Sequence, residues 1–277
     1  GSEMCKETDA DLDEYLTCID ALRPTVSFPI LKGLEIEYCP DSLDYYSFLF
    51  KEKKLDYLLL GQHYYQDDDG SYISAFSTPE KIGTRGYIKY ARSVKEALET
   101  GYFPILAHPD VFFNNPYSWD DNCEEACDII LNAAIQTGTV LELNANGIRK
   151  GIQLLGNDRR WPYPYPNFWK KVAKTSIPVL IGSDCHDPAS MWDSCVEEAY
   201  RIAAEWNLSD NLTDNSKTIQ FTRAIRNTIE CSLCEHSIVM NRVFDAPAAS
   251  QLIFAYKKVR VNCNEKCFFL PYKKGCL

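Results

Sequence analysis

Apolar residues alternate between short runs and longer periodic segments from about residue 28 to residue 206. The short runs are nearly continuous and predict buried strands, namely "FPILKGLEIEY", "DYLLLGQHYY", "FPILAHP", "TVLELNANG" and "IPVLIGSDCH". Each run is followed by a segment with helical spacing, such as "EEACDIILNAAIQTG" or "SCVEEAYRIAAEW". Buried strands that alternate with helices are typical of a parallel sheet with right-handed crossovers. The pattern therefore predicts one α/β domain with a barrel-like arrangement.

The pattern changes near residue 209, where the polar stretch "SDNLTDNS" interrupts the alternation. We therefore expect a domain over residues 1–208 and a C-terminal extension over residues 209–277. Within the extension, "QLIFAYKKVRV" predicts one or two strands to which the sequence assigns no role. Two cysteine pairs in the extension could hold a zinc ion, although the spacing between the pairs matches no motif. The pairs are Cys231 with Cys234 and Cys263 with Cys267.

Composition and charge narrow the classes of function. A formal net charge of −10 over 277 residues, with no run of Lys or Arg, argues against a nucleic-acid-binding surface. No apolar run approaches the roughly 18 residues of a membrane span, and no signal peptide is visible. Twelve cysteines without a secretory signal indicate reduced thiols and a cytoplasmic protein.

Polar side chains gather at the carboxyl ends of the predicted strands, where parallel α/β barrels build their active sites. Three of the four histidines in the chain occupy such positions. Imidazole and carboxylate groups suit zinc, manganese or iron, and a carboxylate can bridge two such ions. Sites with several metal ions hydrolyse phosphate esters. The strand-end residues are Glu35, His63, His108, Glu142, Asn144, Asp184 and His186.

The stretch "IPVLIGSDCHDP" places Asp184 and His186 two residues apart at the end of a strand. If the extended backbone continues through them, both side chains point to the same side of the sheet. The chain has no Walker loop, no G-x-G-x-x-G sequence and no G-x-S-x-G nucleophile elbow. Metal-assisted hydrolysis is therefore the chemistry that these residues favour.

At these residues the chain resembles the PHP (polymerase and histidinol phosphatase) superfamily, in particular its histidinol-phosphatase branch. The matching stretches are "GLEIEY", "DYLLLGQH", "ILAHPD", "LELNANGIRKG" and "GSDCHDP", in the order that the family has them. They extend over roughly residues 28 to 206. The resemblance implies a distorted (β/α)7 TIM-like barrel with up to three divalent transition metal ions, which would be zinc, manganese or iron.

The resemblance also implies roles for individual residues. Glu35 is expected to bridge two metal ions, and His63 and His108 are expected to complete one of them. Asp184 is expected to bind the other bridged ion and His186 the third, and we take these two as the predicted catalytic residues.

Two assignments have a competing neighbour. Glu37 shares a strand face with Glu35 and is the alternative carboxylate ligand. The substrate phosphate is expected to bind Arg149, a contact that the resemblance implies, because a guanidinium offers paired donors to phosphate oxygens. Lys150 is the alternative cation.

The chain departs from the pattern of the family before Glu35, where the family has a His-x-His strand and further histidines. No histidine precedes Glu35 in this sequence. We therefore expect an N-terminally incomplete barrel, either because upstream sequence is missing or because the protein has diverged to a reduced site. The sheet edge beside "FPILKGLEIEY" is then expected to be open, unless the C-terminal extension covers it.

The sequence thus predicts a metal-dependent phosphomonoesterase that hydrolyses histidinol phosphate or a similar small phosphate ester. One alternative is a PHP-like hydrolase of another phosphorylated substrate, such as a nucleotide or phosphotyrosine. The other is a catalytically impaired scaffold that binds metal or a partner. The enzyme is expected to bind a small phosphorylated molecule and to bind neither nucleic acid nor a membrane.

Overall fold

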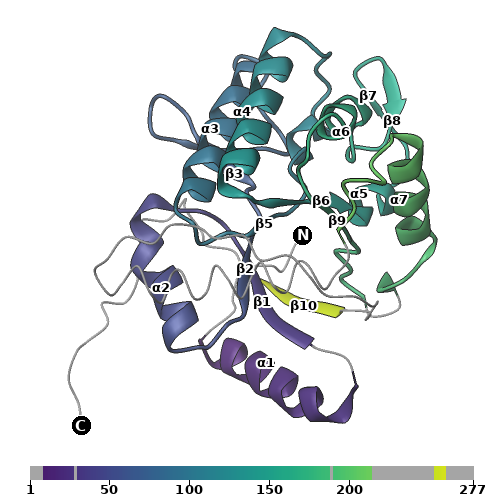
Figure 1. The fold of residues 1–277 in the computed structure, drawn as a ribbon. Coiled ribbons are helices and arrows are strands. Elements are labelled where there is room, and N and C mark those ends of the chain that lie inside the picture. Colours follow the sequence, from purple (N-terminus) through teal and green to yellow (C-terminus); the bar gives the residue numbers. More distant parts are fainter. Residues whose placement is uncertain (1–8, 28–29, 188–189, 214–252, 260–277) are drawn as a thin grey trace.

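Six parallel strands form the main sheet, in the order β10-β1-β2-β5-β6-β9. The structure is a computed structural model that describes residues 9–27, 30–187, 190–213 and 253–259. The sheet is curled like half of a barrel, with helices around it (Figure 1). The strands are β1 (Ile30–Ile36), β2 (Tyr57–Leu60), β5 (Ile105–Leu106), β6 (Val140–Asn144), β9 (Val179–Gly182) and β10 (Ile253–Val259).

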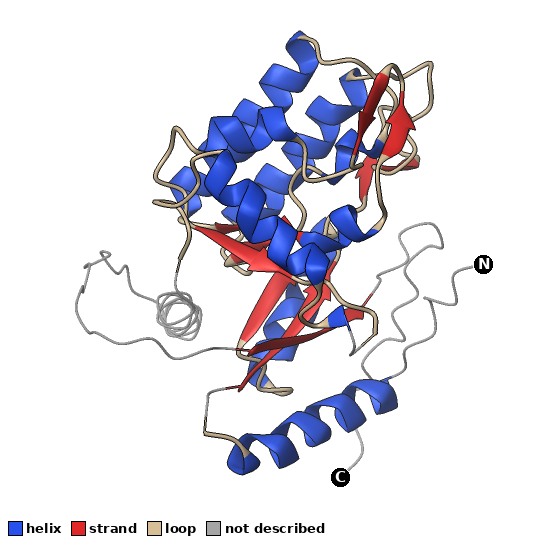
Figure 2. Ribbon diagram, turned by 90° about the vertical axis from the view of Figure 1, so that its right-hand side faces the viewer, coloured by secondary structure: helices blue, strands red, loops and turns tan. Residues whose placement is uncertain are grey.

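Helices alternate with these strands, as the sequence pattern predicts. They are α1 (Asp9–Leu22), α2 (Leu43–Lys51), α3 (Arg85–Glu99), α4 (Asp121–Thr137), α5 (Ala145–Arg149), α6 (Pro166–Val172) and α7 (Ser194–Glu205). The bounds of α4 follow from its caps, because Asp120 accepts from the backbone N–H of Cys123 and Gly138 ends the helix with a φ of 70°. Helix α1 lies at the opposite end of the molecule from α3 and α4 (Figures 1 and 2). None of the helices in the described ranges is long and apolar enough to cross a membrane.

Short elements fill the connections between the strands and helices. Two antiparallel hairpins and three 3-10 turns belong to this group. The hairpins pair β3 (Tyr64–Gln66) with β4 (Tyr72–Ser74) and β7 (Gln153–Leu155) with β8 (Asp158–Arg160). The 3-10 turns are η1 (Arg23–Thr25), η2 (Pro40–Ser42) and η3 (Val111–Asn114).

The two faces of the sheet bury different sets of side chains. Leu58 and Leu60 of β2 pack into the large core beneath the helices, whereas Leu59 belongs to a smaller apolar cluster on the other face. Side chains alternate along a strand, so Glu35, which lies opposite Leu59 in the register of β1 and β2, shares that second face. The second face is therefore apolar along the strands and polar at their carboxyl ends, where the predicted site lies.

The strand β10 corrects the expectation of an open edge beside β1. It pairs with β1 in parallel over seven residues, from Ile30 opposite Ile253 to Ile36 opposite Val259. This pairing satisfies backbone groups that an edge strand would leave to solvent. Part of the C-terminal extension thus belongs to the main sheet, next to β1 in Figure 1. The seven-stranded barrel and the domain limits remain predictions, and the two cysteine pairs lie outside the described residues.

Candidate metal centre

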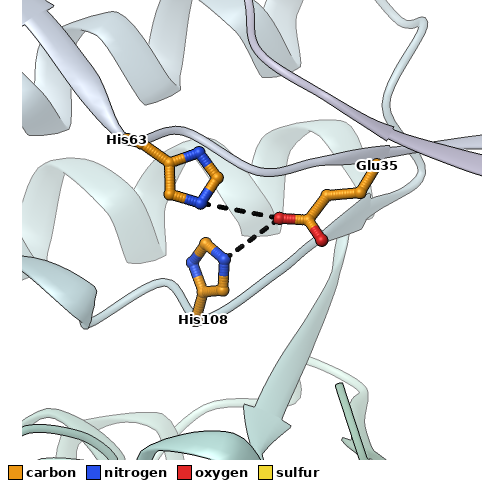
Figure 3. Close-up of side chains that lie close together, drawn as sticks. All are labelled: Glu35, His63 and His108. Carbon is orange, nitrogen blue, oxygen red and sulfur yellow. Dashed lines mark hydrogen bonds and ion pairs between the residues drawn. The ribbon is translucent and has the colours of Figure 1, made fainter. Parts of the chain in front are cut away.

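Three neighbouring strands bring Glu35, His63 and His108 together. Glu35 lies in β1, His63 follows the end of β2, and His108 follows the end of β5. Because β1, β2 and β5 are adjacent and parallel, their carboxyl ends lie next to one another. The three side chains therefore converge although they are far apart in the sequence, as Figure 3 shows.

The geometry of this cluster is that of a potential metal site. His108 Nε2 lies 3.2 Å and His63 Nε2 lies 3.6 Å from the same oxygen, Glu35 Oε1. One ligand atom from each residue lies within 4.8 Å of the others, and all three side chains are buried. A buried carboxylate is costly unless a positive charge compensates it. Two imidazole nitrogens and one carboxylate oxygen fit a divalent transition metal ion, which would provide that charge.

Glu37 orients His63 and does not face the cluster itself. Its Oε2 lies 3.0 Å from His63 Nδ1, and its Oε1 accepts from the backbone N–H groups of His63 at 2.7 Å and Tyr64 at 2.8 Å. A carboxylate only accepts hydrogen bonds, so the imidazole carries its proton on Nδ1 and presents the Nε2 lone pair toward Glu35. This is the carboxylate–histidine arrangement that typically supports a metal ligand. Of the two competing carboxylates, Glu35 is the one that meets both histidines.

Glycines make room for the buried carboxylates. A Cβ atom at Gly61 would lie 2.2 Å from Glu35 Oε1, and one at Gly182 would lie 1.8 Å from Glu142 Oε1. Both distances are far shorter than any van der Waals contact. The glycines in "LLLGQH" and "VLIGSDC" are therefore required by the close approach of a glutamate from the neighbouring strand.

Asp184 and His186 do not continue the extended strand, which was the condition for the expectation that both side chains point to the same side of the sheet. Strand β9 ends at Gly182, and Asp184 has a φ of 43°. The backbone turns there, so the Asp184 side chain is 4% exposed whereas that of His186 is 56% exposed. His186 Nδ1 lies 4.0 Å from Asp184 Oδ1, and neither residue joins the three-residue cluster among the residues described. Their predicted roles as ligands and catalytic residues remain predictions.

Positive φ angles occur at two of the predicted ligands. Apart from Asp184, His108 has a φ of 29°, in a region that residues other than glycine rarely adopt. Such conformations cost about 1–3 kcal/mol each and gather at functional sites. Lys54 and Asn207 also have positive φ angles, so two of the four such residues other than glycine in the described ranges lie at strand ends of the candidate site.

Glu142, which lies at a predicted strand end and has no predicted role, is connected to the site by hydrogen bonds. Its Oε2 accepts from the backbone N–H of His108 at 3.2 Å and from Asn144 Nδ2 at 2.9 Å. Asn144 and Asn146 also donate to Asp184 Oδ2, so this network connects the ends of β6 and β9. Burial, and then the nearby charge of Asp184, raises the pKa of Glu142 to about 7. The signal in the sequence was a glutamate within the otherwise apolar "VLEL".

Arg149 uses its guanidinium within the protein. Its Nε donates to Asp193 Oδ2 at 2.9 Å, and its Nη1 donates to the backbone oxygen of Ser183 at 3.0 Å. Its Nη2 lies 3.2 Å from Asp193 Oδ1 and 3.3 Å from the backbone oxygen of Ser190. Arg149 thereby connects α5 to the two sides of the segment that carries Asp184. Its predicted contact with a substrate phosphate remains a prediction, because such a contact requires an exchange of these partners.

Comparison with known proteins finds a distantly similar sequence and structures of low similarity. No protein-family profile matches the chain. The chain is 23% identical over 185 residues to a probable histidinol-phosphatase from Deinococcus radiodurans. The aligned region covers 65% of this chain and 67% of the relative. It is thus weakly homologous to a histidinol-phosphatase, which supports a PHP-like superfamily as its class.

Two solved structures resemble the chain at low similarity. One is histidinol phosphate phosphatase from Lactococcus lactis in complex with zinc, L-histidinol and phosphate, with 16% identity and a TM-score of 0.49, covering 73% of this chain and 75% of that one. The other is a chain of an archaeal ribonuclease P with mature tRNA, with 14% identity and a TM-score of 0.48, covering 89% and 88%. Similarity at this level does not identify a function.

Proposed function

We propose that the protein is a metal-dependent phosphomonoesterase of the histidinol-phosphatase type, acting on histidinol phosphate or a similar small phosphate ester. The observation that carries the proposal is the convergence of Glu35, His63 and His108 on a single point between adjacent strand ends. The similarity to a probable histidinol-phosphatase supports the type of reaction.

In this proposal Glu35, His63 and His108 hold one divalent ion, either zinc, manganese or iron. Asp184 and His186 bind the remaining ions of a site that takes up to three. The bound ions would offset the charge of the phosphate and promote attack by water. Glu37 keeps the His63 proton on Nδ1, and the Arg149 hydrogen bonds hold the segment that carries Asp184 in place.

Metal analysis of histidine variants tests the proposal. The chain should hold about one tightly bound transition metal ion per molecule after chelation and reloading, and the loaded protein should hydrolyse small phosphate esters. The double variant His63→Ala/His108→Ala should lose that ion. His186→Ala is the comparison variant, because it removes an imidazole outside the three-residue cluster; the ion held by Glu35, His63 and His108 should stay bound, and only an ion held by His186 itself should be lost.

The outcomes separate the functions under consideration. A double variant with the metal content of the parent would refute the metal site. A parent that binds the ion and hydrolyses no phosphate ester would favour a metal-binding scaffold over an enzyme. A parent that prefers nucleotides or phosphotyrosine over histidinol phosphate would keep the reaction and change the substrate.

A further inference from the structure

Lys150 contacts two aromatic rings that neighbour the candidate metal centre. It directly follows α5, which begins at the carboxyl end of β6. Its Nζ lies 4.7 Å from the ring centroid of Tyr163 and 5.1 Å from that of Phe76. Both distances are within the range of cation–π interactions, so the ammonium group contacts both rings.

The same two rings pack against the two histidines of the centre. The Phe76 ring stacks on His63 with centroids 5.5 Å apart and an angle of 16° between the planes. The Tyr163 ring lies 6.1 Å from that of His108. The histidine rings are themselves 4.9 Å apart. Each residue of this group contacts the next, and the last contacts the first. In order, the residues are Glu35, His63, Phe76, Lys150, Tyr163 and His108.

Close packing fixes the rings that hold Lys150. A Cβ atom at Gly147 in α5 would lie 2.1 Å from the backbone oxygen of Tyr163 and 2.3 Å from its Cδ2. The helix therefore lies directly on Tyr163, whose side chain is buried. Lys150 directly follows the last residue of this helix. The packing of the helix against Tyr163 therefore fixes the position of the Lys150 backbone relative to the Tyr163 ring that its ammonium group contacts. The residue itself is exposed, so a ligand can reach it from solvent.

A phosphate ester needs such a cation, because buried carboxylates surround the centre, namely Glu35, Glu37, Glu142 and Asp184. A metal ion offsets part of this charge, and the phosphate oxygens that the metal does not bind need donors from the protein. The neighbouring Arg149 already directs its donors to Asp193 and Ser183. A lysine ammonium binds phosphate as a point charge with three rotatable donors.

We propose that Lys150 donates to the phosphate group of the substrate at the candidate metal centre and is a substrate-binding residue of this site. The inference rests on the proposed phosphatase function and adds the residue that recognises the anion. Phe76 and Tyr163 act as positioning residues, because the ammonium group contacts both rings and each ring packs against one histidine of the centre.

Inorganic phosphate is the probe that tests this role, with binding measured by calorimetry on the metal-loaded full-length chain. Lys150→Met keeps an unbranched apolar stem against the rings and removes the charge, Lys150→Gln removes the charge with a polar end, and Lys150→Arg keeps the charge. Lys170→Met is the matched control, because Lys170 is an exposed lysine on α6. Metal content and thermal melting are recorded for every variant.

We expect Lys150→Met and Lys150→Gln to weaken phosphate binding by about tenfold to a hundredfold, as for the loss of one charge-assisted hydrogen bond. KM for a phosphate ester should rise similarly. Lys150→Arg should retain most of the affinity, Lys170→Met all of it, and the metal content should stay the same in every variant.

Two results overturn the inference in different ways. If the parent binds phosphate and hydrolyses esters while both charge-removing variants behave like it, Lys150 is not a phosphate ligand and the proposed function stands. If the metal-loaded parent neither binds phosphate nor hydrolyses any ester, the proposed function fails and the role of Lys150 fails with it.

Discussion

Glu37→Gln tests whether the proton position on His63 controls metal binding. In the parent, Glu37 accepts from the backbone N–H groups of His63 and Tyr64 and from His63 Nδ1. A glutamine can keep the two backbone hydrogen bonds with its oxygen, and its NH2 group then faces Nδ1. Because that group donates, Nδ1 must accept and the imidazole proton moves to Nε2. The lone pair that faces Glu35 is then lost.

The expected loss of metal affinity follows from this change of tautomer. Removing the partner that orients a ligating histidine typically lowers metal affinity by about 10- to 100-fold. This corresponds to about 1.4–2.8 kcal/mol of binding free energy. The free energy of unfolding of the metal-free protein should change by less than about 1.5 kcal/mol, the net value of one hydrogen bond, because both backbone donors keep an acceptor.

Two measurements follow the two parts of this prediction. Competition with a chelator gives the metal affinity, and nitrogen NMR of labelled histidine reports which ring nitrogen of His63 carries the proton in the metal-free protein. Glu96→Gln is the matched control, since Glu96 accepts from Tyr38 OH at 3.0 Å away from the site. A Glu37→Gln protein that binds metal like the parent and keeps its proton on Nδ1 would refute the reasoning.

Three further changes have defined outcomes. Gly61→Ala places a Cβ atom 2.2 Å from Glu35 Oε1 and should displace this carboxylate. Metal analysis should then show that the ion is lost, and denaturant unfolding should show a destabilisation of about 1–3 kcal/mol; unchanged metal content would contradict this. Burial raises the pKa of Asp110 from 3.8 to about 6, so its contribution to stability is complete below about pH 4 and is lost as the pH rises through 6. Asp110→Asn can still accept from Trp169 Nε1 and does not titrate. Denaturant unfolding should therefore show that the free energy of unfolding of the variant, relative to that of the parent, rises by about 3 kcal/mol between pH 4 and pH 7. A difference between the two proteins that does not change with pH would refute this. Truncation after residue 213 removes β10, so light scattering and dye binding should detect self-association through β1; a monodisperse truncated chain without dye binding would contradict this.

The sequence by itself determined the class of fold. Continuous apolar runs followed by helical periods identify strands that are buried on both faces, and β1, β2, β5, β6 and β9 all lie within the predicted runs. It also indicated the residues at strand ends, because few polar groups interrupt those runs. Both inferences rest on local pattern, and burial on both faces of a sheet leaves that pattern in any parallel α/β fold.

Contacts between distant segments were beyond the reach of such patterns. The run "QLIFAYKKVRV" predicts a strand, but its place beside β1 depends on pairing between residues more than 200 positions apart. The sequence predicts Glu35 and Glu37 on the same face of one strand, so only the position of His63 shows that the first meets the histidines and the second orients one of them.

Tertiary structure likewise decided the local geometry of the site. The period of two predicts that Asp184 and His186 point together, yet the turn at Asp184 buries the first and exposes the second. Arg149 and Lys150 are adjacent cations in the sequence. In the structure, Arg149 forms hydrogen bonds with Asp193, and Lys150, at the end of the helix that packs against Tyr163, contacts the ring of Tyr163. Local periodicity shows which side chains are buried, whereas the partners of a buried polar group depend on which strands and loops the fold brings beside it.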